Sequence, residues 1–189
     1  MSNMASTSTQ PEHVQLAELR QQFSACSAVA EKLFASISEN KLNLRTSDSA
    51  WSIAECIAHL TSTTALYLPI MSTALMDAPA GDGPYKMDWR GRMLKWVLEP
   101  PYRTRVKTLP SLEPRLNDPR RVLPDFLASQ QEFLSAMQMW NGRALDKVFI
   151  TSPFNQRLRY NIYSLFNVVA AHQRRHLWQA QCVRDTLQG

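Results

Sequence analysis

Two of the four histidines, His172 and His176, are four residues apart in a segment with helical periodicity. On a helix this spacing stacks the two imidazoles about one turn apart, close enough to chelate one divalent ion. A third histidine, His59, lies in another segment with helical periodicity. Three neutral imidazoles from two helices would leave an open coordination position, as catalytic metal sites do. The alternative is a set of core histidines hydrogen-bonded to hydroxyl or backbone groups, since an unpartnered buried imidazole costs about 1–3 kcal/mol.

Two polar residues have the spacing to support such a site. Gln179 follows His176 by three residues on the same helical stripe, so it could orient a ligand or simply mark the polar edge of the stripe. Glu55 lies one turn before His59 and could accept its other ring N–H. A capping box with Ser52 explains Glu55 equally well.

The cysteines and the remaining histidine are expected to lie outside the metal site. The three cysteines, Cys26, Cys56 and Cys182, are odd in number and have no CxxC spacing, which disfavours disulfides and a structural zinc site. Cys56 precedes His59 by three residues and could approach a metal, but a small core residue is the favoured interpretation. His13 has no partner in the pattern and is expected on the surface.

Apolar residues spaced three and four apart predict four helices. Their expected limits are 12–38, 52–76, 122–140 and 162–187. Pro69 should kink the second, Pro124 should lie near the first turn of the third, and Asn141-Gly142 should end the third. The expected fold is therefore all-α, an antiparallel four-helix bundle.

Residues 77–119 hold seven of the eleven prolines and form the long connection between the second and third helices. A connection of this length allows a crossover topology, and it is expected to contain a short helix at 88–98 and to pack across the bundle or form a lid. Residues 147–151 could pair briefly with 157–160 around Ser152-Pro153.

The positive charge of the chain is local. The net charge is +5, and residues 86–121 contain ten basic against four acidic residues. A solvated loop explains this segment, whereas arginines from a loop over the metal end could bind a carboxylate of an anionic substrate. Trp89, Trp96 and Tyr102 would also suit nucleic-acid stacking, but no recognised binding motif accompanies them, so a nucleic-acid partner is disfavoured.

Length and composition restrict the class of protein. The 189 residues, 44% hydrophobic with five glycines, suit one domain, expected at 12–187 after a disordered 1–11. The first ten residues lack the pattern of a signal peptide, and no apolar run reaches 18 residues. A cytoplasmic protein without a membrane span is the expectation.

Two motifs resemble those of the DinB/YfiT-like superfamily. The segment from Trp51 to Leu60 reads WSIAECIAHL, similar to the superfamily signature WSxxExxxHL. The segment from His172 to Gln179 reads HQRRHLWQ, similar to HxxRHxxQ. The resemblance implies a four-helix metal-binding bundle in which His59, His172 and His176 hold nickel, zinc or iron.

The resemblance also implies a homodimer and a range of activities. Some superfamily members are transferases or isomerases that use low-molecular-weight thiols. The leading hypothesis is therefore a metal-dependent enzyme acting on a small molecule, as a thiol-dependent S-transferase or a hydrolase. The alternative is a metal-binding stress-response protein without catalytic turnover. No catalytic residue and no thiol-binding residue are assigned.

Overall fold

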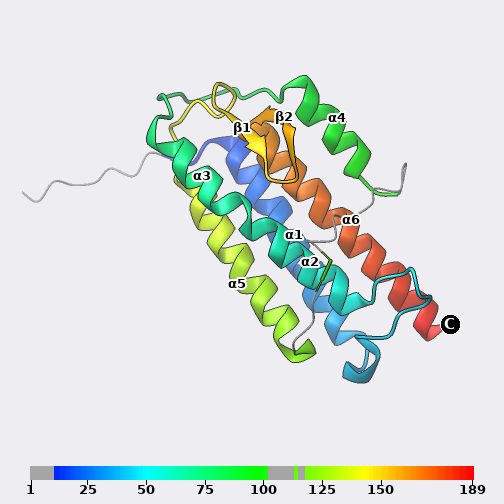
Figure 1. Cartoon of the computed structure of the whole chain (residues 1–189). Coiled ribbons are helices and arrows are strands. Elements are labelled where there is room, and N and C mark those ends of the chain that lie inside the picture. The colour runs from blue at the N-terminus through cyan, green and yellow to red at the C-terminus, as the bar shows by residue number, and fades with distance from the viewer. Residues whose placement is uncertain (1–10, 102–112, 115–117) are drawn as a thin grey trace, which may run out of the picture.

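Four helical rods form the bundle in a computed structural model that describes residues 11–101, 113–114 and 118–189. The rods are α1 (Val14–Ala35), α2 (Ile53–Ala65) continued by α3 (Tyr67–Met76), α5 (Pro119–Gln138) and α6 (Ile162–Gln188) (Figure 1). The all-α four-helix bundle predicted from the periodicity is confirmed. The predicted disorder of 1–11 lies, apart from residue 11, outside the described residues.

The order of the helices around the bundle differs from a simple antiparallel arrangement. Helices α1 and α2 each pack mainly between α5 and α6, so α1 and α2 lie diagonally. Figure 1 shows α1 and α6 running in one direction and α2, α3 and α5 in the other. Because α3 and α5 are parallel, the chain between them must return along the bundle, which confirms the predicted crossover.

The second rod is interrupted at Leu66, one turn before Pro69, where a kink was expected. The rod was expected to be continuous over 52–76, but α2 ends at Ala65, Leu66 separates the helices, and α3 begins at Tyr67. Proline at position 69 clashes with the carbonyl four residues earlier, which is that of Ala65. The helix therefore breaks one turn before the proline.

Side chains cap the start of five helices by accepting a hydrogen bond from a first-turn amide. The capping residues are His13 for α1, Ser52 for α2, Asp88 for α4, Asp118 for α5 and Asn161 for α6. Helix α5 begins at Pro119, three residues before the expected start, because Asp118 caps it and Pro119 suits the first helical position. Pro124 consequently lies inside α5.

Two smaller elements flank α6. The predicted short helix is α4 (Trp89–Leu98), which packs against α6, and a hairpin is formed by β1 (Phe149–Ser152) and β2 (Asn155–Asn161). The antiparallel register pairs Ile150 with Tyr160 and Thr151 with Arg159, as the sequence suggested. None of the described helices is long and apolar enough to cross a membrane.

The bundle core divides into two large apolar clusters. The cluster at the hairpin end includes Phe23, Trp140, Tyr160 and Phe166, and the cluster at the other end includes Cys56, Ile57, Leu60, Phe126 and Leu177. Gln130 and Gln173 also lie in the interior, where their amides exchange hydrogen bonds of 2.9 and 2.6 Å. This reciprocal pairing fixes α5 against α6, beside the segment that carries His172 and His176.

Candidate metal centre

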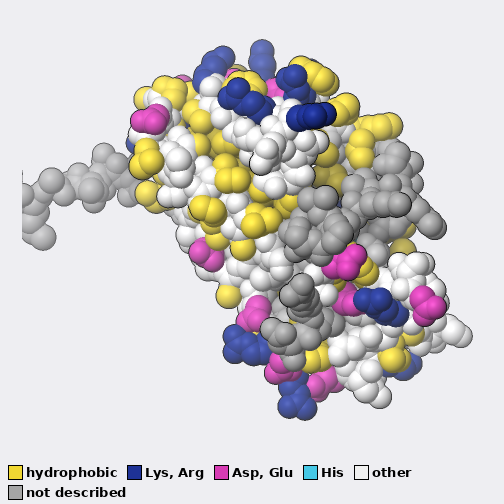
Figure 2. Space-filling model, in the orientation of Figure 1, with side chains coloured by type: hydrophobic (Ala, Val, Ile, Leu, Met, Phe, Trp, Pro, Cys, Tyr) yellow, Lys and Arg dark blue, Asp and Glu magenta, His cyan; other side chains and the backbone are white. Residues whose placement is uncertain are grey.

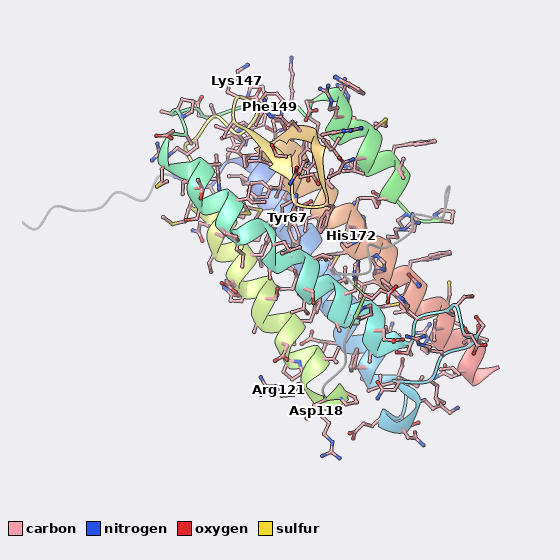
Figure 3. The ribbon with its side chains drawn as sticks, viewed as in Figure 1. Tyr67, Asp118, Arg121, Lys147, Phe149 and His172 are labelled. Carbon is pink, nitrogen blue, oxygen red and sulfur yellow. The ribbon has the colours of Figure 1, made fainter. Side chains whose placement is uncertain are left out.

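Helices α2 and α6 bring His59, His172 and His176 together. The ring centroids of His59 and His176 are 4.6 Å apart, those of His172 and His176 4.6 Å, and those of His59 and His172 5.2 Å. One ring nitrogen of each histidine lies within 4.8 Å of the other two, so the three can hold one metal ion. Figure 3 labels His172 on α6.

Burial keeps at least two of these rings neutral. Burial, with smaller contributions from His59 and Arg175, lowers the pKa of His172 to about 3. The pKa of His176 is also well below its usual value, mainly through burial and then through His172 and His59. A neutral imidazole has a free lone pair for a cation, so the donor set fits a divalent transition-metal ion.

The three rings differ in their access to solvent. His59 is 3% exposed and His176 8%, whereas His172 is half-buried. Two of the donors are therefore held in the interior and the third lies at the margin of the bundle.

Gln179 contacts the ring of His176, three residues before it in α6. The Nδ1–H of His176 donates a hydrogen bond of 3.1 Å to Oε1 of Gln179. This contact selects the tautomer whose other nitrogen, Nε2, carries the lone pair. Outer partners of this kind orient metal-binding histidines in many proteins.

Glu55 holds the start of α2. Its Oε2 accepts a hydrogen bond of 2.8 Å from the Ser52 amide, and both carboxylate oxygens accept hydrogen bonds from Arg45. Although burial raises the pKa of Glu55, the hydrogen bonds from Arg45 and Ser52 outweigh it and hold the pKa below its usual value. The capping-box interpretation is thus confirmed: Glu55 helps to fix the start of α2, the helix that carries His59.

Trp51 and Arg175 border the cluster and were not singled out from the sequence. The Trp51 ring lies 4.8 Å from that of His59 and is stacked at 5.6 Å from that of His176. Arg175 is only 5% exposed, and its Nη1 donates to the Val97 carbonyl of α4 at 3.1 Å. Trp51 lies in the first motif and Arg175 in the second. Their place in these motifs was the only sequence feature that could have pointed to them.

Two other predicted positions lie away from the cluster. Cys56 is fully buried in the apolar core, where burial raises the pKa of its thiol, so its interpretation as a core residue is confirmed. His13 was expected on the surface but is half-buried, because it caps α1 and its ring packs 4.8 Å from that of Tyr85.

The basic segment 86–121 is only partly described. Its α4 portion approaches the histidine-bearing part of α6, where Glu99 pairs with Arg174. Arg90, at the opposite end of α4, lies beside the hairpin. Arg103, Arg105, Lys107 and Arg115 lie outside the described residues, as does Tyr102.

Comparisons with known proteins give one family and one related structure. Residues 22–180 match the model of the DinB superfamily. The fold is similar to that of YfiT from Bacillus subtilis, described as a probable metal-dependent hydrolase with an unusual four-helix bundle topology, at a TM-score of 0.63. The two chains share 10% identity over 97% of this chain and 94% of YfiT, so this likeness shows the fold.

No curated protein sequence matches the chain. The family match nevertheless covers most of the sequence and includes all three clustered histidines. The chain therefore belongs to the DinB superfamily.

Proposed function

We propose that His59, His172 and His176 hold one divalent cation and that the protein is a metal-dependent enzyme acting on a small molecule. The observation that carries this proposal is the convergence of three ring nitrogens within 4.8 Å of one another, in surroundings that keep His172 and His176 neutral. Histidines that only fill the core would not require three ring nitrogens to face one another. The nickel, zinc or iron expected from the family resemblance all accept imidazole nitrogen.

A divalent cation in such a site supplies Lewis acidity and makes a nucleophile available near neutral pH. The neighbouring residues of this chain would hold the histidine ligands in place. Gln179 orients His176, and Trp51 covers the rings of His59 and His176. His172 is the least buried of the three rings, and a small molecule is proposed to approach from its side.

The nucleophile is proposed to come from outside the protein. Among the described residues, the cluster of side chains that could bind a metal consists of the three histidines. It contains no cysteine, aspartate or glutamate. Water and a low-molecular-weight thiol are the two candidates. Hydrolysis is the first reaction to test because YfiT is described as a probable metal-dependent hydrolase, and thiol-dependent S-transfer is the second.

The test is a metal-dependent rate in the purified protein. Protein loaded separately with nickel, zinc or iron(II) would be assayed for hydrolysis of chromogenic esters and amides. Consumption of bacillithiol, mycothiol and glutathione would be followed with a panel of electrophiles. We expect at least one rate that is lost in His176→Ala and kept in His13→Ala, the matched control at the histidine outside the cluster.

Two outcomes would overturn the proposal in different ways. A protein that retains one ion per chain but shows no rate with any metal would be a metal-binding protein without turnover. A rate that persists equally in His176→Ala would place the reaction at another site.

A further inference from the structure

A cluster of three arginines lies at the hairpin end of the molecule. A cavity of about 340 Å³, broadly open to solvent, is lined by Arg90, Phe149, Arg157 and Arg159. Figure 2 shows Lys and Arg side chains gathered with hydrophobic ones at the end where Figure 1 places the hairpin and the start of α4. This volume is within the range of small-molecule sites in proteins.

Strand alternation and helix capping place these side chains together. Arg157 and Arg159 are two residues apart in β2 and both are exposed, so they lie on the outward face of the hairpin. Phe149 lies on the adjoining strand and is 45% exposed. Arg90 comes from the first turn of α4, whose capping residue Asp88 accepts a hydrogen bond of 2.7 Å from the Ser164 hydroxyl of α6.

Within the part of the chain that the structure describes, the three guanidinium groups have no carboxylate partner. Among the described residues, none of the three side chains forms a salt bridge or a hydrogen bond, and the Arg90 guanidinium lies 4.5 Å from the centroid of the Trp89 ring. Six other arginines, in contrast, pair with carboxylates: Arg20, Arg45, Arg120, Arg121, Arg174 and Arg184.

The carboxylate that caps α4 is already occupied. Asp88 accepts hydrogen bonds from the Ser164 hydroxyl and from the amides of Asn161, Arg90 and Gly91, at 2.7 to 3.3 Å. These four donors hold its pKa below the usual value although burial raises it. The amides at the start of α4 are thus satisfied by Asp88, and the charge of the three arginines is available to a ligand from outside.

We propose that this cavity binds a small organic anion that carries both a phosphate chain and an aromatic ring, of the class of a nucleoside diphosphate. Guanidinium groups recognise phosphate oxygens through paired hydrogen bonds, and three of them match a multiply charged phosphate chain better than one carboxylate. The exposed ring of Phe149 gives the ligand's ring an apolar surface on which to stack.

This site does not depend on the proposed metal centre. The hairpin passes into α6 at Ile162, and His172 is ten residues further along, which corresponds to about 15 Å of helix. Figure 3 labels Phe149 at the hairpin and His172 further along α6. Ligand binding at the cavity can therefore be measured with the histidine cluster disabled.

The experiment is calorimetric titration of the full-length protein with ADP, inorganic pyrophosphate and adenosine at low salt. We expect saturable binding of one ADP per chain, at least tenfold weaker binding of pyrophosphate, and weaker binding still of adenosine. The variant Arg157→Gln/Arg159→Gln should weaken ADP binding at least tenfold, and Phe149→Ser should remove the preference for ADP over pyrophosphate.

The matched control is Arg120→Gln/Arg121→Gln, which changes the charge equally at the start of α5, far from the hairpin in Figure 3. This control and His176→Ala should keep ADP binding within twofold of the wild type. Absence of ADP binding, or an equal loss in both arginine double variants, would overturn the proposal. So would tighter binding of a single-stranded oligonucleotide than of ADP, because it would assign the surface to nucleic acid.

Discussion

The histidine cluster and the arginine cavity each gather three side chains of one type, but they differ in burial and charge. The histidines lie between α2 and α6, and two of them are almost fully buried. The three arginines are exposed and face solvent from α4 and β2. Burial lowers the pKa of imidazole and keeps the ring neutral, whereas guanidinium stays charged at any pH at which the protein is folded. The first cluster therefore suits a cation and the second an anion.

The two regions share a scaffold without sharing residues. Helix α4 is tied to α6 near the hairpin by the hydrogen bond between Asp88 and Ser164, and near the histidines by that between Val97 and Arg175. Each region lies at one of these attachments. A substitution in one cluster should consequently leave the chemistry of the other intact, and the following predictions test that separation.

The largest effect is expected from His176→Ala. Loss of one of the three nitrogen donors should weaken binding of a divalent ion by roughly 100-fold or more. Competition titration against a chelator of known affinity would measure this change. Arg157→Gln/Arg159→Gln should bind the ion as the wild type does. An equal loss of affinity in the arginine variant would show that the two regions are coupled.

A smaller effect on the same affinity is expected from Gln179→Ala. Without the acceptor for its Nδ1–H, His176 loses its preferred tautomer and orientation, and affinity should fall about tenfold. Gln179→Glu keeps an acceptor at this position and should restore most of the affinity. If both variants bind the ion like the wild type, Gln179 does not position His176.

Acid should destabilise the metal-free protein through the histidine cluster. Because burial lowers the pKa of His172 to about 3, the unfolded chain takes up a proton at higher pH than the folded one. This contribution to stability is present above the unfolded pKa of about 6.5 and is lost as the pH falls towards 3.

Urea unfolding between about pH 7 and pH 4 measures this loss. The dependence on pH should be shallower in His172→Gln, which has no ring to protonate. The arginine double variant should keep the wild-type slope. A wild-type slope in His172→Gln would contradict the assignment of this pH dependence to the histidine cluster.

The smallest effect is expected from Arg45→Ala, which removes the half-exposed partner of Glu55. Such pairs contribute about 0.2–1 kcal/mol, so the free energy of unfolding should fall by no more than this. Metal affinity should change less than twofold because the Ser52 capping box still fixes the start of α2. A large loss of metal affinity would show that Arg45 has a direct part in the metal site.

Local sequence spacing was enough to predict the pair of His172 and His176, but not the position of His59 beside them. The i, i+4 spacing of His172 and His176 places both rings on one face of any helix, and the Ser52–Glu55 capping box marks the start of α2. The meeting of α2 and α6 is not local, and its prediction rested on the family resemblance. The contacts of Trp51 and Arg175 could not be predicted, because they depend on how three separate segments pack.

The arginine cavity shows what spacing does not reveal. Arg90 lies more than sixty positions before Arg157 and Arg159, and the three meet only because α4 packs beside the hairpin. The interruption at Leu66 was only partly predicted: the apolar seam continues through Pro69, so periodicity alone predicts one helix, and only Pro69 indicated a kink. Hydrophobic patterns determine which face is buried, whereas steric and long-range contacts determine where helices break and meet.

Titration of the metal-free wild-type protein with zinc, followed by calorimetry and elemental analysis, tests the central claim most directly. The arrangement of His59, His172 and His176 predicts one tightly bound ion per chain and its loss when all three are replaced by alanine. The variant His13→Ala should still bind one ion. Absence of binding in the wild type, or equal binding in the triple variant, would contradict the assignment of this histidine cluster as a metal site.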